Sequence, residues 1–169
     1  MLETQVTQWG YNIALELGAE EMGFDIMVTS GEANRTLISK ALNRRINEGD
    51  IVHIGVAPKR DGLTACQRAS VVAVDIPGKI STWQKYWFDF VEDAYRIGLD
   101  TLNSNEPLGN QIVTMLDVAI RGVGNGWNDI IIPNLDYIVV EKTLGKYGNK
   151  VKVMNQLPIN LQHLAGKQK

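Results

Sequence analysis

The sequence is poor in the residues that form disulfides and soft metal sites. Its 169 residues include one cysteine, Cys66, so an internal disulfide is excluded, and only two histidines. No run approaches the roughly 20 apolar residues of a membrane span, and no basic segment followed by an apolar one opens the chain. We therefore expect a reducing, cytoplasmic setting and no membrane association.

Clustered positive charge is also missing. The chain has 17 Lys and Arg residues against 19 Asp and Glu, a formal net charge of -2. Its densest basic spots, Arg44-Arg45 and Lys59-Arg60, are short. A nucleic-acid binder needs Lys and Arg gathered on one face to neutralise phosphates, so this function is not expected. The length suits one domain or two small lobes.

The first half of the sequence predicts a helix followed by three antiparallel strands. Apolar residues recur at three-to-four spacing from Val6 to Met22, which predicts an amphipathic helix that ends at Gly23. Short β-branched runs predict strands over residues 24–30, 50–57 and 63–74, the last two joined by an Asp61-Gly62 turn. Residues 32–48 read as a loop, or as a short helix around 37–45.

The second half predicts two covering helices and a hairpin. Trp83, Trp87 and Val91 begin the apolar stripe of a long helix, and residues 112–120 read as a shorter helix that Gly122 stops. The glycine-rich residues 122–126 read as a linker. Residues 136–140 and 150–154 are expected to pair across a turn at 145–149.

The stretch from Gly49 to Ala69 carries the most specific motif. It contains a Gly-Asp turn, an apolar strand from Ile51 to Ile54, the Asp61-Gly62 turn and then Arg68. This frame resembles the active-site strands of creatinase, the proline-specific aminopeptidases and methionine aminopeptidase. In that family one aspartate ends the first strand and a second precedes the arginine. Here those positions fall at Gly55 and Cys66, and neither supplies the hard oxygen ligand that a bridging divalent ion needs.

The resemblance implies an α+β, pita-bread-like fold. Residues 1–122 would form a first lobe with an N-terminal helix, an antiparallel meander and two covering helices. Residues 123–169 would form a partial or degenerate second lobe with a β-hairpin. In the family the second half carries a His-Gly motif and two glutamates that complete the metal site. The only segment here that is similar to the His-Gly motif runs from His163 to Gly166. The sequence is therefore either a fragment of a longer chain or degenerate in this half.

Five residues are candidates for a site, and each has a structural alternative. His53 and His163 are weak candidates for proton transfer, and a partly buried, satisfied histidine is the alternative. Cys66, Arg68 and Glu141 are candidates for binding. An inert thiol, an architectural ion pair and a solvated strand-end carboxylate are the respective alternatives. No metal ligand set and no cofactor are expected.

Two functions remain open. The favoured one is a domain that has lost metal-dependent catalysis and binds a peptide or protein partner or acts as a scaffold, because fold and chemistry are separable. The alternative is an active, metal-free creatinase-like hydrolase of a small C–N-containing substrate, or a fragment of an Xaa-Pro aminopeptidase or dipeptidase. A homo-oligomer is expected, because an incomplete second lobe leaves apolar surface.

Overall fold

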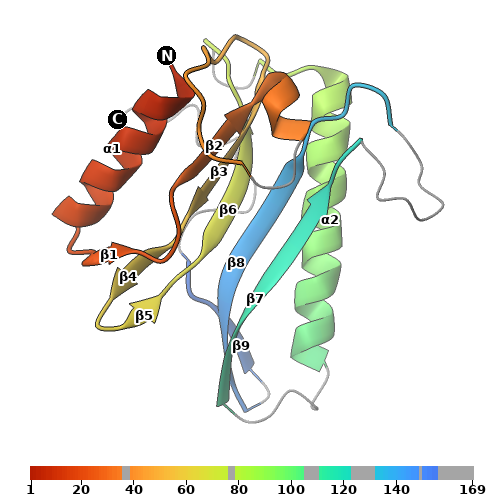
Figure 1. Cartoon of the computed structure of the whole chain (residues 1–169). Coiled ribbons are helices and arrows are strands. Elements are labelled where there is room, and N and C mark those ends of the chain that lie inside the picture. The colour runs from red at the N-terminus through yellow and green to blue at the C-terminus, as the bar shows by residue number, and fades with distance from the viewer. Residues whose placement is uncertain (36–38, 76–78, 105–110, 123–131, 149, 156–169) are drawn as a thin grey trace.

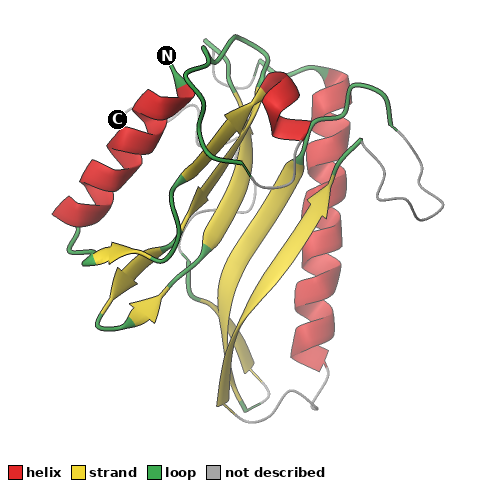
Figure 2. Cartoon of the chain, in the orientation of Figure 1, coloured by secondary structure: helices red, strands yellow, loops and turns green. Residues whose placement is uncertain are grey.

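The protein is an α+β domain in which two helices cover one face of an antiparallel sheet (Figures 1 and 2). The structure, a computed structural model, describes residues 1–35, 39–75, 79–104, 111–122, 132–148 and 150–155. Within these ranges, no helix is both long enough and apolar enough to cross a membrane.

The main sheet has the strand order β2-β3-β6-β8-β7, with β9 added beside β8. All of its strand pairs are antiparallel. A small second sheet, in the order β1-β4-β5, extends the turn between β3 and β6. The main strands are β2 (Met27–Ser30), β3 (Ile51–Val56), β6 (Gln67–Val72), β7 (Gln111–Ile120), β8 (Ile138–Tyr147) and β9 (Lys150–Val153); the small ones are β1 (Glu21–Met22), β4 (Pro58–Arg60) and β5 (Leu63–Thr64). The predicted meander of β2, β3 and β6 is confirmed.

Two α-helices and one short 3-10 helix complete the described elements: α1 (Glu3–Glu16), α2 (Thr82–Ser104) and η1 (Gly31–Arg35). Ser81 caps α2, since its hydroxyl accepts from the Gln84 amide at 3.1 Å while the Gln84 side chain accepts from the Ser81 amide. Figure 1 shows α1 beside β2 and α2 beside β7, at opposite ends of the sheet.

Both helices lie on the same face of the sheet. Val28, Ile54, Ala69, Val140 and Val118 are consecutive cross-strand partners, so their side chains share one face. The β2 end of this row packs with apolar residues of α1, and the β8–β7 end packs with α2. The neighbouring row, one residue along each strand, therefore points to the opposite face, which neither helix covers.

Several elements were predicted incorrectly from the sequence. The helix predicted over 112–120 is wrong, because this segment is strand β7. Its alternate apolar residues face α2, where Leu116 lies 3.2 Å from the position of a Cβ on Gly98. The first helix stops at Glu16, and Gly18, with φ +91°, turns the chain so that residues 21–22 form β1. The described residues 39–45 are not helical.

The predicted hairpin is confirmed, with a longer first strand. β8 runs to Tyr147, and Gly148, with φ +59°, begins the turn to β9. β8 also lies between β6 and β7, so residues beyond 122 complete the sheet that the first lobe begins. The division of the chain at residue 122 stays a prediction.

Candidate functional site

A row of side chains crosses the face of the sheet opposite the two helices. Met27 pairs with Gly55, Gly55 with Arg68, Arg68 with Glu141, and Glu141 with Asp117. One residue from each of five adjacent strands therefore lies in a single line. Two of the predicted binding residues, Arg68 and Glu141, are direct neighbours in this row.

Arg68 is the centre of the row. Its Nε donates to Glu141 Oε2, its Nη2 donates to Asp117 Oδ2, and its Nη1 donates to the Tyr137 hydroxyl at 3.2 Å. The Arg68 and Glu141 side chains are 11% and 4% exposed, whereas the Asp117 side chain is 39% exposed. The planar guanidinium thus uses all three nitrogens, two of them on carboxylates, in a largely buried network.

Gly55 leaves the space that the stem of Arg68 fills. A Cβ added at Gly55 would lie 2.6 Å from Met27 Cε and 3.1 Å from Arg68 Cγ. The Met27 methyl can move, but the Arg68 stem is held by its guanidinium contacts. An aspartate at position 55, where the resemblance places a metal ligand, would therefore press against the Arg68 stem and require it to shift.

Cys66 lies beside the same network with its backbone tied to β8. Its amide donates to Thr143 Oγ1 at 3.2 Å, and the Thr143 hydroxyl donates to the Cys66 carbonyl at 2.9 Å. Burial, and then the neighbouring Glu141 carboxylate, raise the pKa of the thiol to about 12. The side chain is therefore a neutral thiol at neutral pH, neither a nucleophile nor a ready metal ligand.

His53 is buried next to Tyr137. Its side chain is 0% exposed, and the two rings meet edge to face with centroids 5.2 Å apart. Neither ring nitrogen has a hydrogen-bond partner within the described part of the chain. Burial, and then the charge of Arg68, lower the His53 pKa to about 4. A neutral imidazole with this pKa is a weak proton acceptor at neutral pH.

The structure brings together four of the five predicted site residues. His53, Cys66, Arg68 and Glu141 all contact or adjoin one network, whereas His163 lies outside the described residues. Sequence analysis missed Asp117 and Tyr137. Asp117 is the only charged residue of β7, a signal that the helical interpretation of this segment concealed.

The metal pair that the resemblance implies does not fit these residues. Among the residues that the structure describes, no group of three or more His, Cys, Asp or Glu side chains is arranged to hold a metal ion. The carboxylates of Asp117 and Glu141 are both bound to a guanidinium, and the Cys66 thiol is protonated. A divalent cation would have to enter next to a fixed positive charge.

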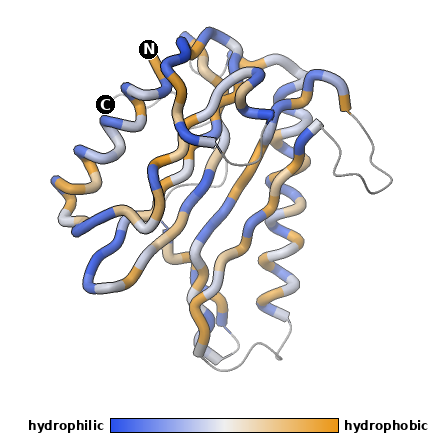
Figure 3. Tube along the Cα trace, viewed as in Figure 1, coloured by the Kyte–Doolittle hydropathy of each residue, from blue (hydrophilic) through white to orange (hydrophobic). Residues whose placement is uncertain are grey.

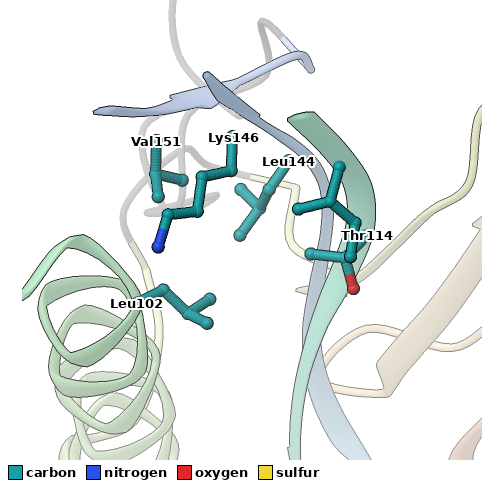
Figure 4. Close-up of a pocket in the computed structure, with 6 residues that line it drawn as sticks. Leu102, Thr114, Leu144, Lys146 and Val151 are labelled. Carbon is teal, nitrogen blue, oxygen red and sulfur yellow. The ribbon is translucent and has the colours of Figure 1, made fainter. Parts of the chain in front are cut away.

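Two cavities lie away from the Arg68 network. One lies where the end of α2 meets the sheet, with Lys146 reaching toward Leu102 (Figure 4); its volume of about 10 Å³ suits one water molecule. The other, about 230 Å³, is an open surface depression beside α1. An exposed ion pair between Asp25 and Lys40 contributes to its rim. Neither contains a residue of the Arg68 network.

The fold and the altered metal frame define a pita-bread domain of the creatinase and aminopeptidase type. The sequence model of metallopeptidase family M24 matches residues 1–131, so the chain belongs to this family. The predicted α+β pita-bread fold and the family resemblance are thereby confirmed. A search of curated proteins found no match.

Solved structures of similar fold support the assignment. A prolidase from Pyrococcus horikoshii OT3 superposes with a TM-score of 0.76 at 17% identity, over 95% of this chain and 56% of its own. The X-Pro aminopeptidase of Thermotoga maritima MSB8 gives 0.75 at 15% identity, over 95% and 55%. Aminopeptidase PepP of Pseudomonas aeruginosa gives 0.80 at 11% identity, over 98% and 52%. The chain thus spans about half the length of these proteins.

Proposed function

We propose that this chain is an M24 domain that has lost metal-dependent hydrolysis and binds a peptide or protein partner. One observation carries the proposal: Arg68, in the segment that resembles the active-site strands of the family, ion-pairs with both Glu141 and Asp117. A metal-dependent hydrolase needs anionic ligands free for its ions, and here the guanidinium binds both carboxylates.

The kind of partner is inferred from the fold, and not from a formed ligand pocket. The similar structures are named prolidase and X-Pro aminopeptidase, which makes Xaa-Pro dipeptides and longer Xaa-Pro peptides the first ligands to test. The surface on which such a peptide would lie is the Asp117 end of the row, where the Asp117 side chain is 39% exposed.

The metal-free hydrolase is the second candidate. It rests on His53, which lies on the same sheet face as the Arg68 network and has no hydrogen-bond partner among the described residues. Full burial keeps this imidazole away from a substrate, and its lowered pKa makes it a weak base. The remaining reading, a fragment of an Xaa-Pro peptidase, is consistent with a chain half the length of its structural relatives.

The test combines metal analysis, turnover and binding on one preparation. The purified protein is incubated with Mn²⁺, Co²⁺ or Zn²⁺, dialysed, and assayed on Xaa-Pro dipeptides and creatine. We expect no stoichiometric metal and no turnover. Stoichiometric metal with turnover that a chelator abolishes would overturn the proposal, and chelator-resistant turnover of creatine would favour the His53 hydrolase.

Peptide binding is measured by titrating Xaa-Pro peptides while following tryptophan fluorescence. We expect saturable binding that an Asp117→Ala substitution weakens, with Asp25→Ala, on the other side of the sheet, as the matched control. No binding by any peptide would exclude the peptide and leave a folded protein as the partner class.

Self-association is proposed for the same domain. α1 exposes Trp9 and Ile13, its C-cap residue Leu17 is also exposed, and α2 exposes Phe90 and Ile97 by 49% and 68%. Figure 3 shows hydrophobic positions along the length of both helices. A second copy that covers such apolar surface would give a dimer in sedimentation velocity. A clean monomer at micromolar concentration would contradict it.

A further inference from the structure

Gly55 and Cys66, the two residues at the positions of the family's metal-binding aspartates, both lie next to Arg68. Gly55 and Arg68 are direct partners on adjacent strands, and the Arg68 stem occupies the space of a side chain at position 55. Cys66, two residues before Arg68, is a neutral thiol whose pKa is raised by burial and then by the same carboxylates. The absence of a side chain at position 55 is what the inward-lying stem of Arg68 requires.

The charges in the row show what the guanidinium does. Glu141 and Asp117 are neighbours across β8 and β7 and would repel each other if both were ionised with nothing between them. In a metal site of this kind, divalent ions neutralise such carboxylates. Here the Arg68 Nε and Nη2 each contact one of the two carboxylates, with the fork geometry that suits bidentate recognition.

We propose that Arg68 is the resident cation of this site: it takes the electrostatic place of a divalent metal between Asp117 and Glu141, and it excludes metal from the domain. Gly55 makes room for it, and Tyr137 orients it through a hydrogen bond at 3.2 Å. This assignment does not depend on whether the domain binds a peptide, because its tests measure metal uptake and stability.

Removal of Arg68 has a specific consequence under this proposal. Two carboxylates would remain side by side, with the Cys66 thiol next to Glu141 and the volume of a guanidinium left between them. Carboxylate oxygens and a thiolate are donors that Zn²⁺ accepts, and carboxylates suit Mn²⁺. An Arg68→Ala variant is therefore expected to acquire a divalent-metal site that the wild-type protein lacks.

The experiment compares thermal unfolding and equilibrium dialysis of wild type and Arg68→Ala with Zn²⁺, Mn²⁺ or EDTA. At metal concentrations near 100 times the dissociation constant, Tm of the variant should rise by roughly 5–10 °C, with about one ion bound per chain. Wild type should show neither effect. Should the variant fail to fold in EDTA, refolding in Zn²⁺ against refolding in EDTA gives the same comparison.

Two further variants make the result specific. Arg68→Ala combined with Glu141→Gln removes the central carboxylate, so the gained metal response should be lost. Arg44→Ala is the matched control, because Arg44 is another largely buried arginine, which contacts the Ser30 carbonyl and Asp50 away from the row. Stoichiometric metal in wild type would overturn the proposal. So would the absence of any metal-dependent Tm shift or refolding in Arg68→Ala.

Discussion

Glu3 and Glu141 are two buried carboxylates that the same chain stabilises in different ways. Glu3 is 0% exposed, and its donors among the described residues are neutral: the Ser30 amide at 2.7 Å, the Ser30 hydroxyl at 2.6 Å and the Leu42 amide at 2.9 Å. Glu141 is 3% exposed and is paired with the charged Arg68.

The two kinds of partner distinguish a carboxylate that supports the fold, Glu3, from one that belongs to the altered site, Glu141. Two of the three donors of Glu3 are backbone amides, and they join the start of α1 to β2 and to the segment at Leu42. The partner of Glu141 is a side chain that carries a full charge, whose place another cation can take once that side chain is removed. The first carboxylate therefore serves the fold, and the second retains the electrostatics of a cation site.

The largest predicted effect is the loss of the Glu141 partner. Arg68→Met should lower the free energy of unfolding by about 3–5 kcal/mol, because it leaves a buried carboxylate without its cation. Urea unfolding measures the change. Arg68→Met with Glu141→Gln should recover much of it, and equal instability of the single and double variants would contradict the pairing.

The next effect concerns a third buried group, His53, whose ring has neither kind of partner among the described residues. The unfolded histidine takes up a proton near its ordinary pKa of 6.5, whereas the folded one does so only near about 4. Stability is therefore full above pH 6.5 and falls as the pH drops toward 4, by roughly 3 kcal/mol. Unfolding curves at pH 7.5 and pH 5 should show about 2 kcal/mol of this loss, and His53→Phe should reduce it. An unchanged pH dependence would refute the assignment.

Removal of the other glutamate comes next. Glu3→Ala should cost about 2–3 kcal/mol, since buried donors of Ser30 lose their acceptor. Glu3→Gln keeps one acceptor oxygen and should cost less. Metal should rescue neither variant, in contrast to Arg68→Ala. A metal-dependent rise in Tm for Glu3→Ala would remove the distinction between the two carboxylates.

The smallest predicted effect concerns the space that Gly55 leaves for the Arg68 side chain. Gly55→Ala places a methyl group against Met27 and the Arg68 stem and should cost about 1–2 kcal/mol through overpacking. Gly62→Ala is the control for a glycine whose added Cβ meets nothing within 4 Å, although its φ of +76° adds backbone strain. If Gly55→Ala were neutral while Arg68 kept its contacts, the proposed coupling between these positions would be wrong.

The sequence predicted the parts of the fold that local pattern determines. The Gly49–Arg68 frame gave β3 and β6 with the correct antiparallel partner, because turn chemistry and β-branched alternation occur together there. β7 was missed because its apolar residues at 112, 116 and 120 fit a helical period of four as well as a strand period of two. Packing against α2 and pairing with β8 make this segment a strand, and both are contacts between residues far apart in the sequence.

The candidate site was predicted residue by residue but not as a network. Arg68, Glu141, Cys66 and His53 were each named, while Asp117 and Tyr137, which contacts both Arg68 and His53, were not. The pairing of Arg68 with Glu141 depends on β8 lying next to β6, a contact between residues 73 positions apart in the chain. No local pattern encodes the order of strands in a sheet.

A double-mutant cycle between Arg68 and Glu141 tests the central claim most directly. The free energies of unfolding of wild type, Arg68→Met, Glu141→Gln and the double variant are measured in metal-free buffer. If Arg68 is the cation of this site, the two substitutions should be coupled by about 1.5 kcal/mol or more. Additivity within about 0.5 kcal/mol would show that the two side chains act independently and would contradict the account.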